Sequence, residues 1–305
     1  MTGEFAAIER LRQLLPGPGQ NAVGIGDDAA AIHLLSGGWL LLAIDAVVGG
    51  VHADLTLTGL DDLGWKALAV NVSDIAAMGG RPDYALLSIA GPPGTDLDLL
   101  SRGVAEAACR YDCSVVGGDL ANSDALVITV AMTGTCDGDP ILRSGARPAD
   151  GIWVTGPLGL SASGLRLLRE SKQATGRAVD VHRRPQPSVP AGLAARAAAA
   201  TSMIDISDGL VADLGHVADA SGVGFALERA PIGDGATLDE ALTGGEDYVL
   251  AFTAKDPGAV VEAFARLTPP QLIGRCTEDA SQRTFQGRSL PAAGGWEHNW
   301  TAPPA

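Results

Sequence analysis

The chain has 305 residues and a formal net charge of −15 at pH 7. Its length allows two domains with sizeable cores. The acidic balance argues against a nucleic-acid or anionic-membrane surface, because both need a basic stripe. Hydrophobic residues make up 46% of the chain but aromatic residues only 4%, so Ala, Val, Leu and Gly must fill the interior.

The cysteines and the first residues indicate a cytoplasmic protein. No C-x-x-C pair occurs, and Cys109 and Cys113, which could share a helix face, have no histidine nearby, so no zinc site is expected. Reduced thiols fit a cytoplasmic location. Glu4 and Glu9 are not followed by a long apolar run, so no signal peptide is expected. The longest apolar stretch, 39–44, is too short to span a bilayer.

The first elements are an amphipathic helix over 5–15 and a glycine-rich acidic turn. The turn, GIGDDAA at 24–30, fits the pattern G-x-G-x-x-A. Asp27 and Asp28 would repel a pyrophosphate, however, and no βαβ unit surrounds them, so we reject a dinucleotide site. The two acids suit a cation-binding turn, and an acidic surface loop explains them equally well.

A buried strand and a buried helix follow. The strand 39–45 ends on Asp45, and His52 lies shortly after it; a lone histidine in such a place is more often structural than functional. The helix 63–78 carries Asp74 with no Arg or Lys within one turn. Because a buried carboxylate without a partner is costly, we expect a distant basic residue, backbone amides or a metal ion to satisfy Asp74.

Residues 1–149 form the first predicted domain, with strands and helices in mixed order. Its further elements are a strand at 84–90, a helix at 97–111 and strands at 114–119 and 126–134. Acids are repeatedly placed at strand ends, among them Asp119, which follows the glycine pair Gly117-Gly118.

Residues 150–305 form the second predicted domain. Its predicted strands begin at 152, 203 and 249, and its predicted helices cover 161–170, 193–200 and 210–220. The segment 171–190 is polar and rich in Arg and Pro, which predicts a mobile loop. The turn 205–208 carries two acids, and Glu246 lies in a glycine-rich turn before a strand.

Acidic turns therefore recur along the whole chain. They are Asp27-Asp28, Asp45, Asp74, Asp119, Asp205, Asp208 and Glu246-Asp247. Together they suggest oxygen-ligand clusters for Mg²⁺, which binds through few carboxylates and substrate phosphates. The sequence has no Walker A loop, no kinase H-R-D or D-F-G set and no G-x-S-x-G. These patterns favour a metal-dependent phosphate enzyme without a P-loop.

Six strings resemble the thiamine-monophosphate kinase family. They are GIGDDAA, DLGWKALAVNVSDIAAMGGRP, VVGGD, RSGARPAD, IDISDGLVADL and GGEDY, and the match continues to Gly295-Trp296-Glu297-His298. That family belongs to the superfamily of aminoimidazole-ribonucleotide synthetase, selenophosphate synthetase and the hydrogenase-maturation protein HypE. The resemblance implies a two-domain α+β subunit, with a C-terminal α/β domain and an N-terminal mixed sheet that pairs in a homodimer to form a β-barrel.

The resemblance also implies the reaction and its residues. The γ-phosphoryl group of ATP would pass to thiamine monophosphate, with the help of several Mg²⁺ ions. The implied metal ligands are Asp28, Asp45, Asp74, Asp119 and Asp205, with Asp208 holding a further ion. The implied ATP contacts are Gly118, Asp119, Arg143 and Ser207. The implied contacts to thiamine monophosphate are His52, Glu246 and Trp296.

The chemistry is consistent with such a site. Because the attacking phosphate oxygen is already ionised near neutral pH, catalysis reduces to alignment and charge neutralisation, with Asp45, Asp74, Asp119 and Arg143 as the catalytic set. Trp296 could stack on a ring of the acceptor, and a packing role in the tail explains it equally well.

The chain departs from the family pattern at three places. Ala43-Ile44 replaces two threonines, Gly49 replaces a glutamate, and Arg102 stands where an aromatic residue is expected. Two other functions therefore stay open. One is a related enzyme that acts on another phosphorylated or carboxylated small molecule, and the other is a catalytically weak nucleotide-binding homologue.

Overall fold

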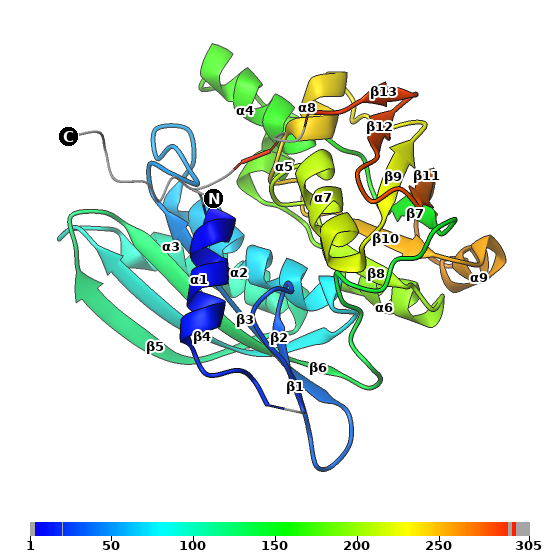
Figure 1. Cartoon of the computed structure of the whole chain (residues 1–305). Helices are drawn as coiled ribbons and strands as arrows, with labels where there is room; N and C mark the ends of the chain where they lie inside the picture. The colour runs from blue at the N-terminus through cyan, green and yellow to red at the C-terminus, as the bar shows by residue number, and fades with distance from the viewer. Residues whose placement is uncertain (1–3, 20, 292–294, 297–305) are drawn as a thin grey trace, which may run out of the picture.

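The computed structural model describes residues 4–19, 21–291 and 295–296. Glu297 and His298, which end the family-like motif, lie outside these described residues. Figure 1 shows two halves, each a sheet with helices against it, and the N-terminal half runs from blue to the first greens. The two-domain α+β organisation expected from the sequence is confirmed.

The N-terminal half is a six-stranded mixed sheet covered by helices. Its helices are α1 (Glu4–Leu14), α2 (Leu60–Ala77) and α3 (Leu97–Tyr111), and its strands are β1 (Ala22–Val23), β2 (Ala30–His33), β3 (Trp39–Val48), β4 (Arg81–Gly91), β5 (Ser114–Asn122) and β6 (Val127–Cys136). The strand order is β1-β2-β3-β6-β4-β5. Only the β4–β5 pair is parallel among these strands.

Helix α2 lies at the centre of the molecule, where it packs on β3 and β6 of one sheet and on elements of the other half. Fourteen of its 18 residues are buried, most of them small or apolar. Close helix packing explains the small residues. A Cβ at Gly64 would lie 2.1 Å from the Leu100 oxygen of α3, and one at Gly192 would lie 2.1 Å from the Ala76 oxygen. Larger side chains at these glycines would push the helices apart.

The sheet face turned away from α2 is exposed and apolar. Strand β4 alternates between residues that face α2, such as Ala85 and Ile89, and the exposed Tyr84 and Leu86. Edge strand β5 is exposed over its whole length. An exposed apolar sheet face and an open edge are typical of an interaction surface.

The C-terminal half is a seven-stranded sheet with helices around it. Its strands are β7 (Gly151–Val154), β8 (Ser202–Asp205), β9 (Gly224–Leu227), β10 (Leu250–Ala254), β11 (Gln271–Thr277), β12 (Arg283–Phe285) and β13 (Arg288–Ser289). Its helices are α4 (Leu160–Glu170), α5 (Arg177–Arg183), α6 (Val189–Ala197), α7 (Leu210–Ser221), α8 (Leu238–Thr243) and α9 (Pro257–Ala263). The strand order is β13-β12-β9-β11-β7-β10-β8.

Two expectations for this half are wrong. The segment 171–190 is not a mobile loop, because helix α5 lies inside it, with Val179 and His182 buried and the Arg183 side chain bonded to the Leu57 carbonyl. The polar composition hid a short helix whose few apolar residues face inward. The half is also not an α/β domain of parallel strands. Apart from the parallel β9–β12 pair, its described pairings are antiparallel.

The acids do not all follow strands. Asp205 ends β8 as expected, but Asp45 and Asp119 lie inside β3 and β5, which continue to Val48 and Asn122. The turn residues Gly49-Gly50 and Ser123-Asp124 follow the true ends of these strands and not the two acids. No helix in the described part of the chain is long and apolar enough to cross a membrane.

Candidate active site

A cavity of about 1340 Å³ lies between the two halves. Helix α2 lines it with Lys66, Val70 and Asp74, which recur every four residues and so share one helix face. The predicted site residues that line the cavity are Asp28, Asp45, His52, Asp74, Arg143, Asp205, Ser207, Asp208, Glu246 and Trp296. The fold therefore brings together most residues of the predicted site.

Three carboxylates meet at one end of the cavity. Asp28 comes from the turn before β2, Asp74 from α2 and Asp205 from the end of β8, and one oxygen of each lies within 4.8 Å of the others. The Asp28 side chain is fully buried, and its Oδ2 atom has no hydrogen-bond partner. The hydroxyl of Ser73, also on α2, donates to Asp205 over 2.6 Å and holds that carboxylate in place. We call Asp28, Asp74 and Asp205 the acid cluster.

Arg143 lies beside the acid cluster. Its Nε and Nη2 atoms donate to Asp28 Oδ1 over 3.0 and 2.5 Å, and its backbone N–H donates to Asp27 over 3.0 Å. Burial alone would lower the pKa of Arg143, but the carboxylates of Asp28, Asp205 and Asp27 together outweigh it and raise that pKa. Arg143 therefore stays charged, and Asp28 and Asp27 fix its position.

The acid cluster carries more negative charge than Arg143 balances. Burial, followed by the charges of Asp205 and Asp45, raises the pKa of Asp74 well above its usual value. Burial and the Asp28 charge raise the pKa of Asp205 to about 7. Oxygen ligands in excess, one of them with an unpaired buried atom, suit a divalent cation such as Mg²⁺. The residues present fit that ion.

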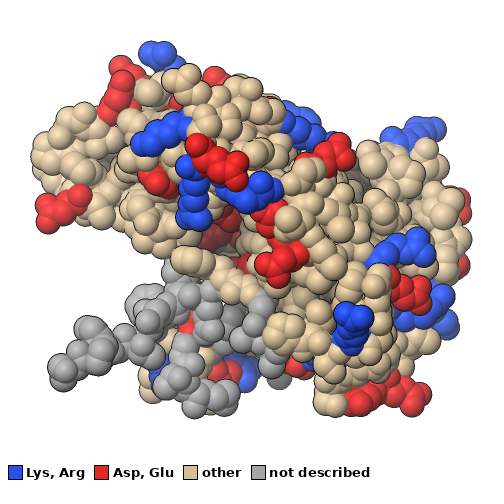
Figure 2. Space-filling model, turned by 90° about the horizontal axis from the view of Figure 1, so that it is seen from above, with Lys and Arg blue, Asp and Glu red and all other residues tan. Residues whose placement is uncertain are grey.

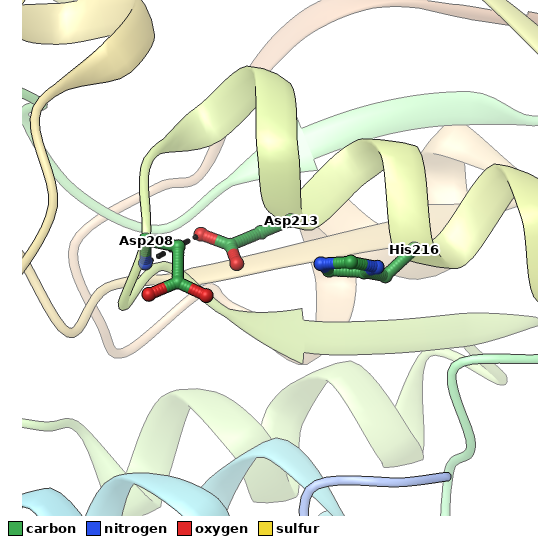
Figure 3. A group of neighbouring side chains, drawn as sticks. All are labelled: Asp208, Asp213 and His216. Atoms are coloured by element: carbon green, nitrogen blue, oxygen red, sulfur yellow. Dashed lines mark hydrogen bonds between the residues drawn. The ribbon is translucent and has the colours of Figure 1, made fainter. Parts of the chain in front are cut away.

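A second group of possible ligands follows strand β8. Asp208, Asp213 and His216 offer ligand atoms within 4.8 Å of one another, and Figure 3 shows them along the start of α7. Asp213 Oδ2 accepts from the backbone N–H groups of Asp208 and Gly209, over 3.2 and 3.0 Å. The sequence analysis missed Asp213 and His216, although their three-residue spacing behind an acidic turn could have indicated them.

A different group lies at the other end of the cavity. The ammonium of Lys66 on α2 lies 3.1 Å from both carboxylate oxygens of Glu246. His182 Nδ1 lies 3.7 Å from Glu246 Oε2 and 3.1 Å from the Ser161 hydroxyl. We call Lys66, Glu246, His182 and Ser161 the lysine network. The sequence analysis predicted only Glu246, because the other three belong to distant elements that only the fold unites.

The other two predicted substrate contacts also reach this cavity. His52 Nδ1 accepts from the Val48 N–H over 2.9 Å, which fixes its ring. The backbone N–H of Trp296 donates to the Asp208 carbonyl over 3.2 Å, while 55% of the residue stays exposed.

Gly118 and Asp119 do not line the cavity of their own chain. Asp119 pairs with Ser88 and so shares the outward face of Tyr84 and Leu86, whereas Asp45 pairs with the buried Val130 and faces α2. The single chain therefore separates Asp119 from the acid cluster. Arg102 lies on the exposed side of α3.

Family models match both halves of the chain. The N-terminal domain model of AIR synthase related proteins matches residues 26–136, and the C-terminal domain model matches residues 147–285. The thiamine-monophosphate kinase of Escherichia coli K12 is 35% identical over 319 aligned positions, which cover 97% of each chain. The thiamine-monophosphate kinase of Mycobacterium tuberculosis H37Rv is 34% identical and covers 97% of this chain and 91% of its own length.

Solved structures show the same fold. A structure described as AaThiL complexed with AMPPCP and TMP superposes with a TM-score of 0.86 at 33% identity and covers 97% of both chains. The thiamine monophosphate kinase of Aquifex aeolicus superposes with a TM-score of 0.80 at 32% identity and covers 93% of this chain and 97% of its own. This chain therefore belongs to the thiamine-monophosphate kinase family of AIR synthase related proteins.

Proposed function

We propose that this protein transfers the γ-phosphoryl group of ATP to thiamine monophosphate and so forms thiamine diphosphate. The observation that carries the proposal is the acid cluster beside Arg143, inside a cavity large enough for two substrates. The relative whose described structure holds AMPPCP, an ATP analogue, together with TMP supports the same pair of ligands.

Different residues of the chain would act on the transferring phosphoryl group, on ATP and on the acceptor. Arg143, fixed by Asp28 and Asp27, would place positive charge beside the transferring phosphoryl group. Because the acceptor phosphate is already ionised, the site needs no strong general base, and alignment supplies most of the rate. Ser207 and the neighbouring turn would contact ATP, and His52, Glu246 and Trp296 would contact the acceptor.

We assign Mg²⁺ to the acid cluster together with Asp45, and a further ion to Asp208. When bound, these ions would neutralise phosphate oxygens of both substrates. The unpaired Oδ2 of Asp28 and the raised pKa values of Asp74 and Asp205 support the assignment. Asp213 and His216 lie close enough to Asp208 to complete the second site.

We also propose a homodimer built through the outward face of the N-terminal sheet. The exposed Tyr84, Leu86 and Val116 and the open edge of β5 support it. Because Asp119 lies on that face, it would serve the cavity of the partner subunit instead of its own. The family expectation of two sheets closing into a barrel is compatible with this surface.

The expected absence of nucleic-acid binding stays a prediction. It agrees with the face shown in Figure 2, where described Lys and Arg side chains are interspersed with Asp and Glu. The cytoplasmic location also stays a prediction, and the four free cysteines are compatible with it.

The direct test incubates the purified protein with ATP, Mg²⁺ and thiamine monophosphate and separates the products by chromatography. We expect thiamine diphosphate and ADP in equal amounts. A protein that binds ATP but forms no thiamine diphosphate would contradict the proposal and favour a nucleotide-binding homologue. Other phosphorylated or carboxylated acceptors in parallel reactions test the related-enzyme alternative.

A further inference from the structure

The Lys66 side chain is almost completely buried, with 1% exposed, although it carries an ammonium group. Burying a charge is costly, and a buried ion pair is often no more stabilising than apolar side chains of similar volume. Most of the other buried residues of helix α2 are small or apolar, so an apolar residue would also fit there. A buried lysine at this position therefore calls for a role besides stability.

Glu246 is held on three sides. Its backbone adopts a left-handed conformation with φ of 64°, which is unfavourable for a residue with a side chain. Its N–H donates to the Ser207 carbonyl over 2.7 Å, and a Cβ at Gly245 would lie 2.4 Å from that same oxygen. The Lys66 ammonium then fixes both carboxylate oxygens. The backbone contacts of Gly245 and Glu246 and the ion pair with Lys66 together restrict the position of the Glu246 carboxylate.

The fixed carboxylate can still accept hydrogen bonds from the cavity. An ionised carboxylate has about four lone-pair positions, and Lys66 occupies one on each oxygen. The Glu246 side chain remains 27% exposed and lines the cavity. Its free positions are therefore available to a donor group of a ligand.

His182 does not compete for Glu246. Burial first, then the positive charges of Lys66, Arg183 and Arg169, lower the pKa of His182 to about 3, so its ring is neutral at physiological pH. The Ser161 hydroxyl is its hydrogen-bond partner on α4. The lysine network thus contains one cation, one anion and one neutral ring, and it is balanced without a ligand.

We propose that Lys66 is a positioning residue for the acceptor substrate. Its ammonium holds the Glu246 carboxylate so that the free oxygen positions meet a hydrogen-bond donor on the heteroaromatic part of the acceptor. The inference rests on the proposed function, because it assigns the acceptor to this end of the cavity. Lys66 itself does not touch the reacting phosphates.

Lys66→Met tests the role with a side chain of similar length and no charge. We expect KM for thiamine monophosphate to rise about tenfold, which equals about 1.4 kcal/mol, while KM for ATP changes less than twofold. Lys66→Gln, whose amide can still donate to Glu246, should give a smaller rise. Lys66→Gln also provides the test of the positioning role if Lys66→Met does not fold.

The pH dependence separates positioning from stability. Without Lys66, His182 faces the Glu246 carboxylate with only Arg183, Arg169 and the Ser161 hydroxyl around it, so its pKa should rise above the wild-type value of about 3. In Lys66→Met, KM should therefore fall as pH drops toward that raised pKa, because protonated His182 takes over the pairing. The double variant with His182→Gln should lose this pH dependence, and the wild type should not show it.

Arg184→Gln is the matched control. Arg184 also joins the two halves, through Asp61 over 2.9 Å and through Asp62 and Glu106, but it does not line the cavity. We expect this variant to lower Tm without changing KM. Equal KM changes in Lys66→Met and Arg184→Gln, or an unchanged KM in Lys66→Met, would overturn the positioning role.

NMR titration of His182, assigned with His182→Gln, needs no turnover. The ring should stay neutral from pH 5 to 8 in the wild type, and the pKa of His182 should be higher in Lys66→Met than in the wild type. If the wild type forms no thiamine diphosphate, the proposed function fails whatever this titration shows. An unaltered His182 titration in Lys66→Met contradicts the network itself.

Discussion

The two ends of the cavity differ in how their buried charges are balanced. At the acid cluster the buried carboxylates outnumber the one nearby arginine. Burial and the neighbouring carboxylates therefore raise the pKa values of Asp74 and Asp205. In the lysine network the charges of Lys66 and Glu246 cancel, and His182 stays neutral. The excess negative charge of the acid cluster indicates a site for a cation. The paired charges of the lysine network indicate side chains that are already ordered before a ligand binds.

The largest effect is expected when one negative charge is removed from the acid cluster. Asp74→Asn should lower kcat about a thousandfold, because the proposed metal that neutralises the phosphates would lose one of its ligands. Tm in the absence of metal should be unchanged or higher, since the substitution relieves repulsion within the acid cluster. Asp98→Asn, on the exposed side of α3, is the control and should change neither quantity.

Mixing two inactive variants tests whether the acid end is completed by a partner. If Asp119 serves the other subunit, Asp119→Asn mixed with Asp74→Asn forms hybrid dimers that contain one intact site. Random re-association should restore about a quarter of wild-type activity, because half of the dimers are hybrids with one active site of two. Activity that stays at the level of the separate variants would show that Asp119 does not act across a dimer.

The pH dependence of stability should also differ between the two ends. The folded-state pKa values of Asp205 and Asp27 are raised to about 7 from 3.8, so the folded protein binds more protons than the unfolded chain between these values. Its stability therefore falls as pH rises through that range. In EDTA we expect Tm to drop by about 5 °C from pH 5.5 to 7.5.

Mg²⁺ should reverse that loss of Tm at pH 7.5 and should have little effect at pH 5.5, where protons occupy the same oxygens. Asp205→Asn should flatten the dependence on pH. A Tm that rises with pH in EDTA would contradict the excess of negative charge at the acid cluster.

The smallest effect is expected at Trp296, beside the turn of Asp208. Trp296→Ala should raise KM for thiamine monophosphate about fivefold, since stacking on a cationic ring contributes about 1 kcal/mol. Trp296→Phe should recover most of the loss. Equal Tm values with an unchanged KM would assign Trp296 to packing instead.

The acid end could be predicted from the sequence, whereas the lysine network could not. Asp28, Asp74 and Asp205 each sit in a short string with a recognisable pattern, and α2 was predicted to within three residues of its true start. Lys66 lies in the same string as Asp74, but nothing in that string indicates its partner, and Ser161 and His182 lie in no such string. Their meeting depends on how α2, α4 and α5 pack, and helix α5 lay inside a segment predicted to be a loop.

The strand directions show the same limit. Composition and alternation indicated β3 to β8 and β10, but β1, β2, β9, β11, β12 and β13 were not predicted. They could not show that β7, β10 and β11 are antiparallel neighbours, because pairing depends on residues about a hundred or more positions apart. The face on which Asp119 lies could also be known only once its pairing with Ser88 was known.

Helix α2 has one more consequence. Lys66 and Asp74 lie two turns apart on it, so the rise of the helix separates their backbones by about 12 Å. Since α2 is clamped by α3 on one side and α6 on the other, that interval cannot stretch or shorten. In the proposed arrangement the helix therefore sets a fixed distance between the acceptor ring and the phosphates. It would select acceptors by how far their phosphate stands from their ring.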